Sequence, residues 1–362
     1  MPDADRRLRY VAFYLPQFHP IRENDEWWGP GFTEWVNVAQ GDPLFRGHEQ
    51  PDLPGDLGFY DLRLPETRQA QATLAMHHGI DAFCYFHYWF GGRRMLERPF
   101  EEVFRSGEPD LPFCLCWANE SWTRAWDGKS DEILIEQTYS REDDLAHIRA
   151  LAEVFADPRY LRIDGRPVFL VYRAFRHPRP REFADVWRAE AQRLGIGEIY
   201  LCAVNGGRDQ LLGPDDFGMD AMVAFAPFYG LLRGKRDTKV ARASRELLRS
   251  NNQYVQHRIY DYETVMQDNL DRAVPPQKIF PGVSPGFDNS PRRPSGATII
   301  TGSTPELYER WLRAAVERFE PYSAQENLLF VNAWNEWAEG NHLEPSRRWQ
   351  HQYLEAHARA CS

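Results

Sequence analysis

The feature that most constrains the fold is a set of eight short runs rich in apolar, β-branched and aromatic residues, spread along the 362 residues of the chain. Segments with helical periodicity separate most of these runs. A strand followed by a helix, repeated, predicts a parallel sheet, and strands that are apolar throughout predict burial on both faces. The runs are Tyr10–Leu15, Asp81–Phe90, Pro112–Asn119, Pro167–Arg173, Ile199–Val204, Ala221–Pro227, Lys278–Pro285 and Leu328–Trp337.

Helix signals between these runs complete the pattern. Helices are predicted over Pro65–His78, Arg141–Ala156, Arg179–Leu194 and Thr304–Phe319, where proline in a first turn, Gly195 after a last turn and Thr304-Pro305-Glu306 are start and stop signals. Eight strands of this kind predict an α/β fold, a single (β/α)8 TIM-like barrel. We expect one catalytic domain over residues 1–362, with a long irregular insertion at about 228–277 after strand six.

An open doubly wound sheet is the alternative fold. Such a sheet normally carries a glycine-rich phosphate turn after its first strand. Here Leu15 is followed by Pro-Gln-Phe-His-Pro, and no G-x-G-x-x-G stands nearby. This disfavours a nucleotide-binding half and favours the barrel.

Charge and composition exclude several classes of protein. The net charge is 43 − 53 = −10, which opposes nonspecific binding to nucleic acid or to an anionic membrane. No run approaches the length of a membrane span, and the first ten residues lack the apolar core of a signal peptide, so we expect a soluble, cytoplasmic protein. Four of the five cysteines lie inside apolar runs, which predicts reduced core thiols. The oligomeric state is not readable from the sequence.

Polar and aromatic residues are concentrated where the predicted strands end. In a β/α barrel the active site lies on the loops after the strand carboxyl ends, and a pyranose offers an apolar face for aromatic rings and hydroxyls for polar groups. The alternative is that the rings only fill the barrel core. The candidate substrate-binding residues are Tyr14, Gln17, His19, Trp35, His87, Tyr88, Trp89, Trp117, Asn119, Glu120, Trp122, Arg124, Tyr172, Asp288, Asn335 and Trp337.

The strongest chemical signal is the pair Glu336 and Glu339. Glycoside cleavage commonly uses two carboxyl groups on either side of the scissile bond. In an extended strand these two side chains would point to opposite faces, so we expect the chain to bend near Trp337, with Gly340 favouring a sharp turn. A solvated turn is the structural alternative, but two flanking tryptophans favour partial burial of Glu336 and a raised pKa. Glu120, and after it Asp127 and Asp288, are further candidate acids.

Neither a metal nor a cofactor is expected. His19, His87 and His342 show no H-x-x-x-H or H-E-x-x-H spacing, so sugar binding or core hydrogen bonding is the better interpretation. The insertion carries an excess of basic residues, which predicts contact with an anionic feature of the substrate; a solvated basic helix is the alternative. These residues are Arg233, Lys235, Arg236, Lys239, Arg242, Arg245 and Arg249.

Seven ordered motifs together resemble the WbsX-like family, whose members are associated with bacterial surface polysaccharides and often labelled glycosyltransferases. The family is in turn similar to family ninety-nine glycoside hydrolases, the endo-acting α-mannosidases and mannanases, which are β/α barrels. The motifs are Tyr14–Pro20 (YLPQFHP), Glu26–Gly29 (EWWG), Gly31–Trp35 (GFTEW), Asp56–Tyr60 (DLGFY), Phe83–Trp89 (FCYFHYW), Cys116–Glu120 (CWANE) and Asn332–Gly340 (NAWNEWAEG).

The resemblance implies roles for both glutamates. Glu336 matches the group that deprotonates the sugar 2-hydroxyl, and Glu339 matches the general acid/base, in a retaining mechanism through a 1,2-anhydro sugar. We therefore expect a retaining endo-acting glycoside hydrolase on a bacterial surface or related polysaccharide. The alternatives are a glycosyltransferase of surface polysaccharide synthesis and a noncatalytic glycan-binding module.

Overall fold

The computed structural model describes residues 7–124, 129–206, 212–228, 232, 256–273 and 276–362. Its main sheet has the strand order β12-β10-β9-β8-β4-β2-β1-β16-β13, and every neighbouring pair on this path is parallel. The parallel sheet predicted from the apolar runs is therefore confirmed. The strands are β1 (Arg9–Tyr14), β2 (Ala82–Phe90), β4 (Phe113–Trp117), β8 (Arg166–Val171), β9 (Tyr200–Asn205), β10 (Ala221–Ala224), β12 (Ile279–Phe280), β13 (Gly282–Val283) and β16 (Leu328–Val331).

The predicted seventh strand is divided in two, and this division brings the ends of the sheet together. Ile279 of β12 pairs with Met222 of β10, whereas Gly282 of β13 pairs with Phe330 of β16. Pro281 lies between the two halves and has no backbone N–H to donate to a neighbour. One short run thus joins the sixth strand to the eighth, and the sheet curves into the predicted barrel.

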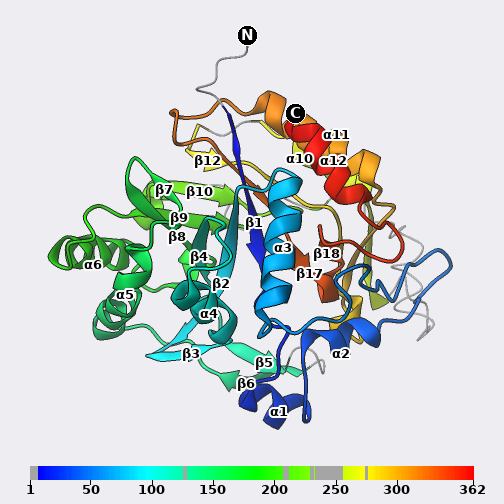
Figure 1. Ribbon diagram of the computed structural model, residues 1–362, viewed down its shortest axis with the longest axis horizontal. Coiled ribbons are helices and arrows are strands. Elements are labelled where there is room, and N and C mark those ends of the chain that lie inside the picture. Colours follow the sequence, from blue (N-terminus) through cyan, green and yellow to red (C-terminus); the bar gives the residue numbers. More distant parts are fainter. Residues whose placement is uncertain (1–6, 125–128, 207–211, 229–231, 233–255, 274–275) are drawn as a thin grey trace, which may run out of the picture.

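Helices cover the outside of the sheet (Figure 1). The four predicted helices are present as α3 (Pro65–His77), α5 (Arg141–Phe155), α6 (Pro180–Arg193) and α11 (Pro305–Arg318). The Thr304 side chain accepts a hydrogen bond from the Leu307 N–H, which confirms the predicted cap of α11. The other helices are α1 (Arg22–Trp28), α2 (Glu34–Ala39), α4 (Arg98–Ser106), α7 (Pro214–Phe217), α10 (Tyr262–Leu270) and α12 (Gln352–Cys361).

Part of the predicted irregular insertion is regular, which corrects that expectation. Residues 256–273 contain β11 (Arg258–Asp261) and α10, and the Asp261 side chain caps α10 by accepting from the Thr264 N–H. β11 pairs with β15 (Thr298–Thr301), which also pairs with β14 (Phe287–Asp288), so the loops after strands six and seven share a small second sheet. The seven basic residues predicted to meet an anionic substrate lie outside the described residues.

The core fills the barrel and the layer between the sheet and the helices. Inside the barrel the ring of Phe13 stacks with Phe86 at 5.6 Å and meets Phe225 edge-on at 5.2 Å. Cys84, Cys114, Cys116 and Cys202 are buried and unbridged, as expected for reduced core thiols. Within the described ranges, the helices lack the combination of length and apolar character that crossing a lipid bilayer requires.

The carboxyl ends of the strands face one end of the barrel. In Figure 1, β1 runs down the view toward α1 and α2, which belong to the loop that follows it. Short elements decorate the loops at this end and elsewhere. They are β3 (Arg93–Met95), β5 (Trp122–Arg124), β6 (Lys129–Ile135), β7 (Arg162–Ile163), β17 (Asn335–Glu336), β18 (Asn341–His342) and the 3-10 turns η3 (Ala174–Arg176), η4 (Ser290–Arg292) and η5 (Trp337–Glu339).

Candidate active site

The loop after β16 carries both predicted catalytic glutamates on one turn. Glu336 ends β17, and Glu339 ends the 3-10 turn η5. Gly340 follows with φ +53°, a left-handed conformation that glycine adopts without strain. In a 3-10 turn, side chains three residues apart lie on the same side. The predicted bend is therefore confirmed, and it turns both carboxylates toward the same part of the molecule.

Arg292 joins the two glutamates to a third carboxylate. Its guanidinium lies 2.7 Å from the carboxylate of Glu339, 3.1 Å from that of Glu336 and 2.9 Å from that of Glu34. Arg292 comes from η4 in the loop after strand seven, whereas Glu34 is the first residue of α2 in the loop after strand one. Three loops of the barrel thus converge on one guanidinium.

Burial gives this cluster unusual electrostatics. The Glu34 side chain is 0% exposed and that of Glu336 is 10% exposed. Burial, opposed by Arg292 and reinforced by the charges of Glu339 and Glu34, raises the pKa of Glu336 to about 8. Burial also raises the pKa of Glu34. Burial lowers the pKa of Arg292, but the three carboxylates outweigh it and leave that pKa well above its ordinary value.

A further buried carboxylate, Glu344, fixes the turn that carries the glutamates. It accepts hydrogen bonds from Trp337 Nε1 at 2.6 Å, Tyr60 OH at 2.8 Å and Gln71 Nε2 at 2.6 Å. Trp337 also stacks on His342, with ring centroids 3.5 Å apart. Because Trp337 directly follows Glu336, this network holds the backbone between the two candidate catalytic residues in place.

A cavity of about 290 Å³ lies beside the carboxylate cluster and is open to solvent. Arg292 forms part of its wall and so links the cavity to Glu336 and Glu339. Its lining mixes aromatic rings with amides, hydroxyls and a carboxylate, which is the composition expected of a sugar site. Five predicted residues line it, namely Gln17, Tyr88, Glu120, Trp122 and Tyr172.

Comparison with known proteins decides the family. The model of the family described as "Glycosyltransferase WbsX" matches residues 10–357. The chain belongs to the WbsX family. It is 44% identical over 347 residues to "Uncharacterized protein WxcX" from two strains of Xanthomonas campestris pv. campestris, a match that covers 96% of this chain and 48% of each relative. The chain thus spans about half the length of the curated relatives it matches.

Solved structures share the fold of this WbsX-family chain. An endo-alpha-mannosidase of glycoside hydrolase family 99 from Bacteroides thetaiotaomicron, in complex with bis-tris-propane, superposes with a TM-score of 0.58 at 13% identity, covering 97% of this chain and 95% of that one. A "Glycoside hydrolase-like protein" superposes with a TM-score of 0.60 at 14% identity, covering 99% and 95%. At these identities the likeness concerns the fold alone.

Four predicted substrate-binding residues of the WbsX-family barrel lie in its outer wall and do not line this cavity. His87 Nε2 lies 2.9 Å from Nε2 of His147 on α5, and Trp89 stacks on the same imidazole. Trp117 packs against α5 and α6. Tyr14 donates a hydrogen bond to a side chain of α3. All four point toward helices because alternate residues of a strand face opposite sides of the sheet.

Asn119 and Asn335 each tie a loop to a neighbouring strand. Asn335 accepts from the Leu15 N–H at 2.7 Å and donates to the Leu15 carbonyl at 3.0 Å, so it joins strand eight to strand one. Asn119 makes the equivalent pair of bonds with the backbone of Arg173. Their amides are committed to the backbone, so these residues position the loops of the site rather than face the cavity.

Four further predicted residues do not line the cavity. Trp35 donates to the Tyr60 carbonyl and packs against Trp337. Arg124 pairs with Glu132 at 2.6 Å and lies over the ring of Trp28, which does line the cavity. His19 is buried, and burial lowers its pKa to about 4.

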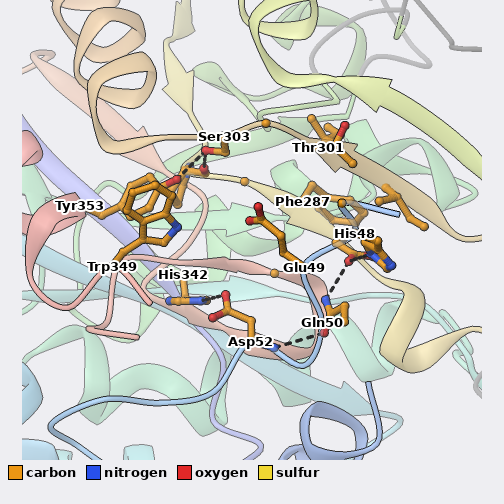
Figure 2. Close-up of a pocket in the computed structure, with 18 residues that line it drawn as sticks. His48, Glu49, Gln50, Asp52, Phe287, Thr301, Ser303, His342, Trp349 and Tyr353 are labelled. Atoms are coloured by element: carbon orange, nitrogen blue, oxygen red, sulfur yellow. Dashed lines mark hydrogen bonds and ion pairs between the residues drawn. The ribbon is translucent and has the colours of Figure 1, made fainter. Parts of the chain in front are cut away.

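The fourth of these, Asp288, lines a separate hollow of about 90 Å³, to whose wall Gly340 also contributes. Figure 2 shows this hollow with His48 and Gln50 among its labelled residues. His48 and Gln50 each donate to its carboxylate at 2.7 Å. Burial raises the pKa of Asp288, but these donors outweigh it and hold the pKa below its usual value. The hollow is smaller than the pockets that normally hold small molecules.

Sequence reasoning missed several residues of the site. Glu34 and Arg292 complete the carboxylate cluster, and Asn24, Trp27 and Trp28 of α1 line the cavity. Glu34 stands in a motif already noted for its resemblance, and Arg292 lies four residues after the predicted Asp288. Asp127 lies outside the described residues. Among the described residues, no group of three or more His, Cys, Asp or Glu side chains is arranged to hold a metal ion.

Proposed function

We propose that this chain is a retaining, endo-acting glycoside hydrolase that cleaves a bacterial surface or related polysaccharide. The observation that carries the proposal is the placement of Glu336 and Glu339 on one turn at the carboxyl end of the barrel, both bound to Arg292, beside a cavity with aromatic and amide walls. Two carboxyl groups beside one sugar site are the usual machinery of glycoside cleavage.

Glu336 suits the role of base toward the sugar 2-hydroxyl. A carboxylate whose conjugate acid has a pKa of about 8 is a stronger base than a solvated glutamate, and it is still partly ionised near neutral pH. Loss of the 2-hydroxyl proton to Glu336 lets that oxygen attack C1 as the glycosidic C1–O bond breaks. The product of this step is a 1,2-anhydro sugar, and the 2-hydroxyl must be trans to the leaving group, as in mannose.

Glu339 then serves as acid and base in turn. Its side chain is 26% exposed, more than that of Glu336, so leaving group and water can reach it. In the first step Glu339 gives its proton to the leaving oxygen. In the second step it takes a proton from a water molecule that attacks C1, the anhydro C1–O2 bond opens, and O2 recovers its proton from Glu336. Each of the two substitutions inverts the configuration at C1, so the product retains the configuration of the substrate.

Glu339→Gln tests this assignment. The purified chain is incubated with mannose- and rhamnose-containing bacterial polysaccharides, and product length and anomeric configuration are followed by chromatography and NMR. Because general acid/base groups contribute about 10²–10⁴-fold, Glu339→Gln should lose most turnover. Glu326→Gln is the matched control, since Glu326 is also a buried carboxylate but accepts from Tyr200 at the start of β9, at the other end of the barrel.

The result also separates the alternatives. The family description names glycosyltransferases, and a transferase would be protected from thermal unfolding by a nucleotide sugar and would elongate an acceptor. A noncatalytic glycan-binding module would bind polysaccharide without shortening it. Equal turnover in Glu339→Gln and Glu326→Gln would contradict the proposed catalytic role.

A further inference from the structure

An amide donor without a partner lies in the cavity wall. Asn24 of α1 is 1% exposed, and its side-chain Nδ2 has no hydrogen-bond partner in the structure. Asn24 lines the cavity beside Arg292. Leaving a buried donor unpaired is unfavourable, and such groups in native structures call for an explanation. A ligand oxygen in the cavity would satisfy this donor.

The surroundings of Asn24 suit a sugar ring. Gln17 is 6% exposed and presents a second carboxamide to the same cavity. Trp27 and Trp28 follow Asn24 on the same short helix, and the rings of Trp27 and Trp122 meet edge-on with centroids 6.0 Å apart. Amides can bond to hydroxyls while indole faces cover the apolar side of a pyranose.

The charges around the cavity argue against an anionic sugar. Glu120 in its wall pairs with both Arg173 and Arg176, and Arg292 pairs with three glutamates. Each of these three guanidinium groups is therefore already paired with at least one carboxyl group. A uronate or phosphate would add a further negative charge to this set, whereas a neutral sugar would bring only hydroxyls.

We propose that this cavity is a subsite for an uncharged pyranose and that Asn24 selects it by donating a hydrogen bond from Nδ2 to a ring or hydroxyl oxygen. The proposal rests on the proposed function only in that the pyranose is a unit of the glycan that is cleaved. A site built to hydrogen-bond a hydroxyl rejects analogues that lack it, because the site group is then left unpaired. Asn24 is thus a specificity residue rather than an acid or base.

Asn24→Leu provides a sharp test because it removes the donor and nearly preserves the shape. The variant is made in the Glu339→Gln background, so that binding is measured without turnover. Calorimetry is performed with neutral di- and trisaccharides of mannose, rhamnose, glucose and galactose, and with the corresponding uronates. We expect neutral probes to bind, uronates to bind at least tenfold more weakly, and Asn24→Leu to weaken neutral binding about tenfold or more.

The thermal midpoint separates this role from a structural one. Replacing an unpaired buried donor with an apolar side chain should leave the midpoint unchanged or raise it. Asn327→Leu is the matched control: Asn327 is also buried, but it accepts from Arg9 Nε at 2.8 Å and donates to the Arg7 carbonyl at 2.6 Å, away from the cavity. This control should lower the midpoint and leave saccharide binding unchanged.

Three results would overturn the inference: no binding of any neutral probe, tighter binding of uronates, or neutral binding unaffected by Asn24→Leu. None of them depends on cleavage. Binding that is sensitive to Asn24 in a chain without hydrolytic activity would refute the proposed function and leave this subsite standing.

Discussion

The guanidinium of Arg292 lies 2.7 Å from the carboxylate of Glu339, and the same guanidinium contacts Glu336 and the fully buried Glu34. One cation therefore compensates three carboxylates that belong to two different loops of the barrel. Because an unpaired buried charge is costly, removing Arg292 should lower the free energy of unfolding. Removing the Glu336 carboxyl group should change how that free energy depends on pH.

Arg292→Met should destabilise the protein by about 3–5 kcal/mol at pH 7, since it leaves buried carboxylates without their cation. The loss should be larger at pH 9 than at pH 5, because Glu336, whose pKa is about 8, is mainly ionised at pH 9 and protonated at pH 5. Denaturant unfolding at these pH values measures both effects. Arg313→Met, which removes a helix-surface pair with Glu309, should cost less than about 1 kcal/mol. Equal losses in the two variants would show that the cluster is not a buried charge network.

The titration of Glu336 should appear as a pH dependence of stability. In the folded protein its pKa is about 8, whereas in the unfolded chain the group loses its proton near its ordinary value of 4.5. Folding takes up a proton between these values, so the contribution of Glu336 is fully present at low pH and is lost as pH rises through about 8. The thermal midpoint of wild type should therefore fall relative to that of Glu336→Gln as pH rises from 5 to 8. Parallel curves would refute a raised pKa.

Much of the fold follows from the apolar runs, because strands buried on both faces of a parallel sheet are continuous in sequence. The break at Pro281 and the sheet of β11, β15 and β14 do not follow from those runs. The strands concerned are two to four residues long, and β11 pairs with β15 although three other strands lie between them in the sequence. Strands this short leave too little periodicity to detect.

The candidate site, like the fold, could be predicted only in part from the sequence. The bend at Gly340 was predictable, because two glutamates three residues apart cannot share a side of an extended strand. The contact of Arg292 with Glu34 joins loops 258 residues apart and has no local signal. In β2 every residue is buried, so the sequence cannot distinguish the inward face, with Phe86 and Tyr88, from the outward face with His87.

Glu344→Gln should loosen the turn that carries the two candidate catalytic residues. Glu344 accepts from three donors, and an amide can satisfy fewer of them, so we expect a loss of about 1–3 kcal/mol in unfolding free energy. Tyr60→Phe removes one of the donors, and a double-mutant cycle with Glu344→Gln should give a coupling energy of about 0.5–3 kcal/mol. Glu355→Gln, an exposed position on α12, is the control. Strict additivity would exclude the network.

His87→Leu tests whether His87 belongs to the barrel wall or to the substrate site. Burial lowers the pKa of His87 to about 3, so its neutral form stabilises the fold above the unfolded pKa of 6.5, and this stability is lost as pH falls from 6.5 toward 3. The variant should therefore lose less thermal stability than wild type between pH 7 and pH 5. At pH 7 it should cost about 1 kcal/mol through the lost bond to His147. Saccharide KM should be unchanged, whereas Trp122→Ala in the cavity should raise it. A KM increase in His87→Leu as large as that in Trp122→Ala would show that His87 contributes to substrate binding.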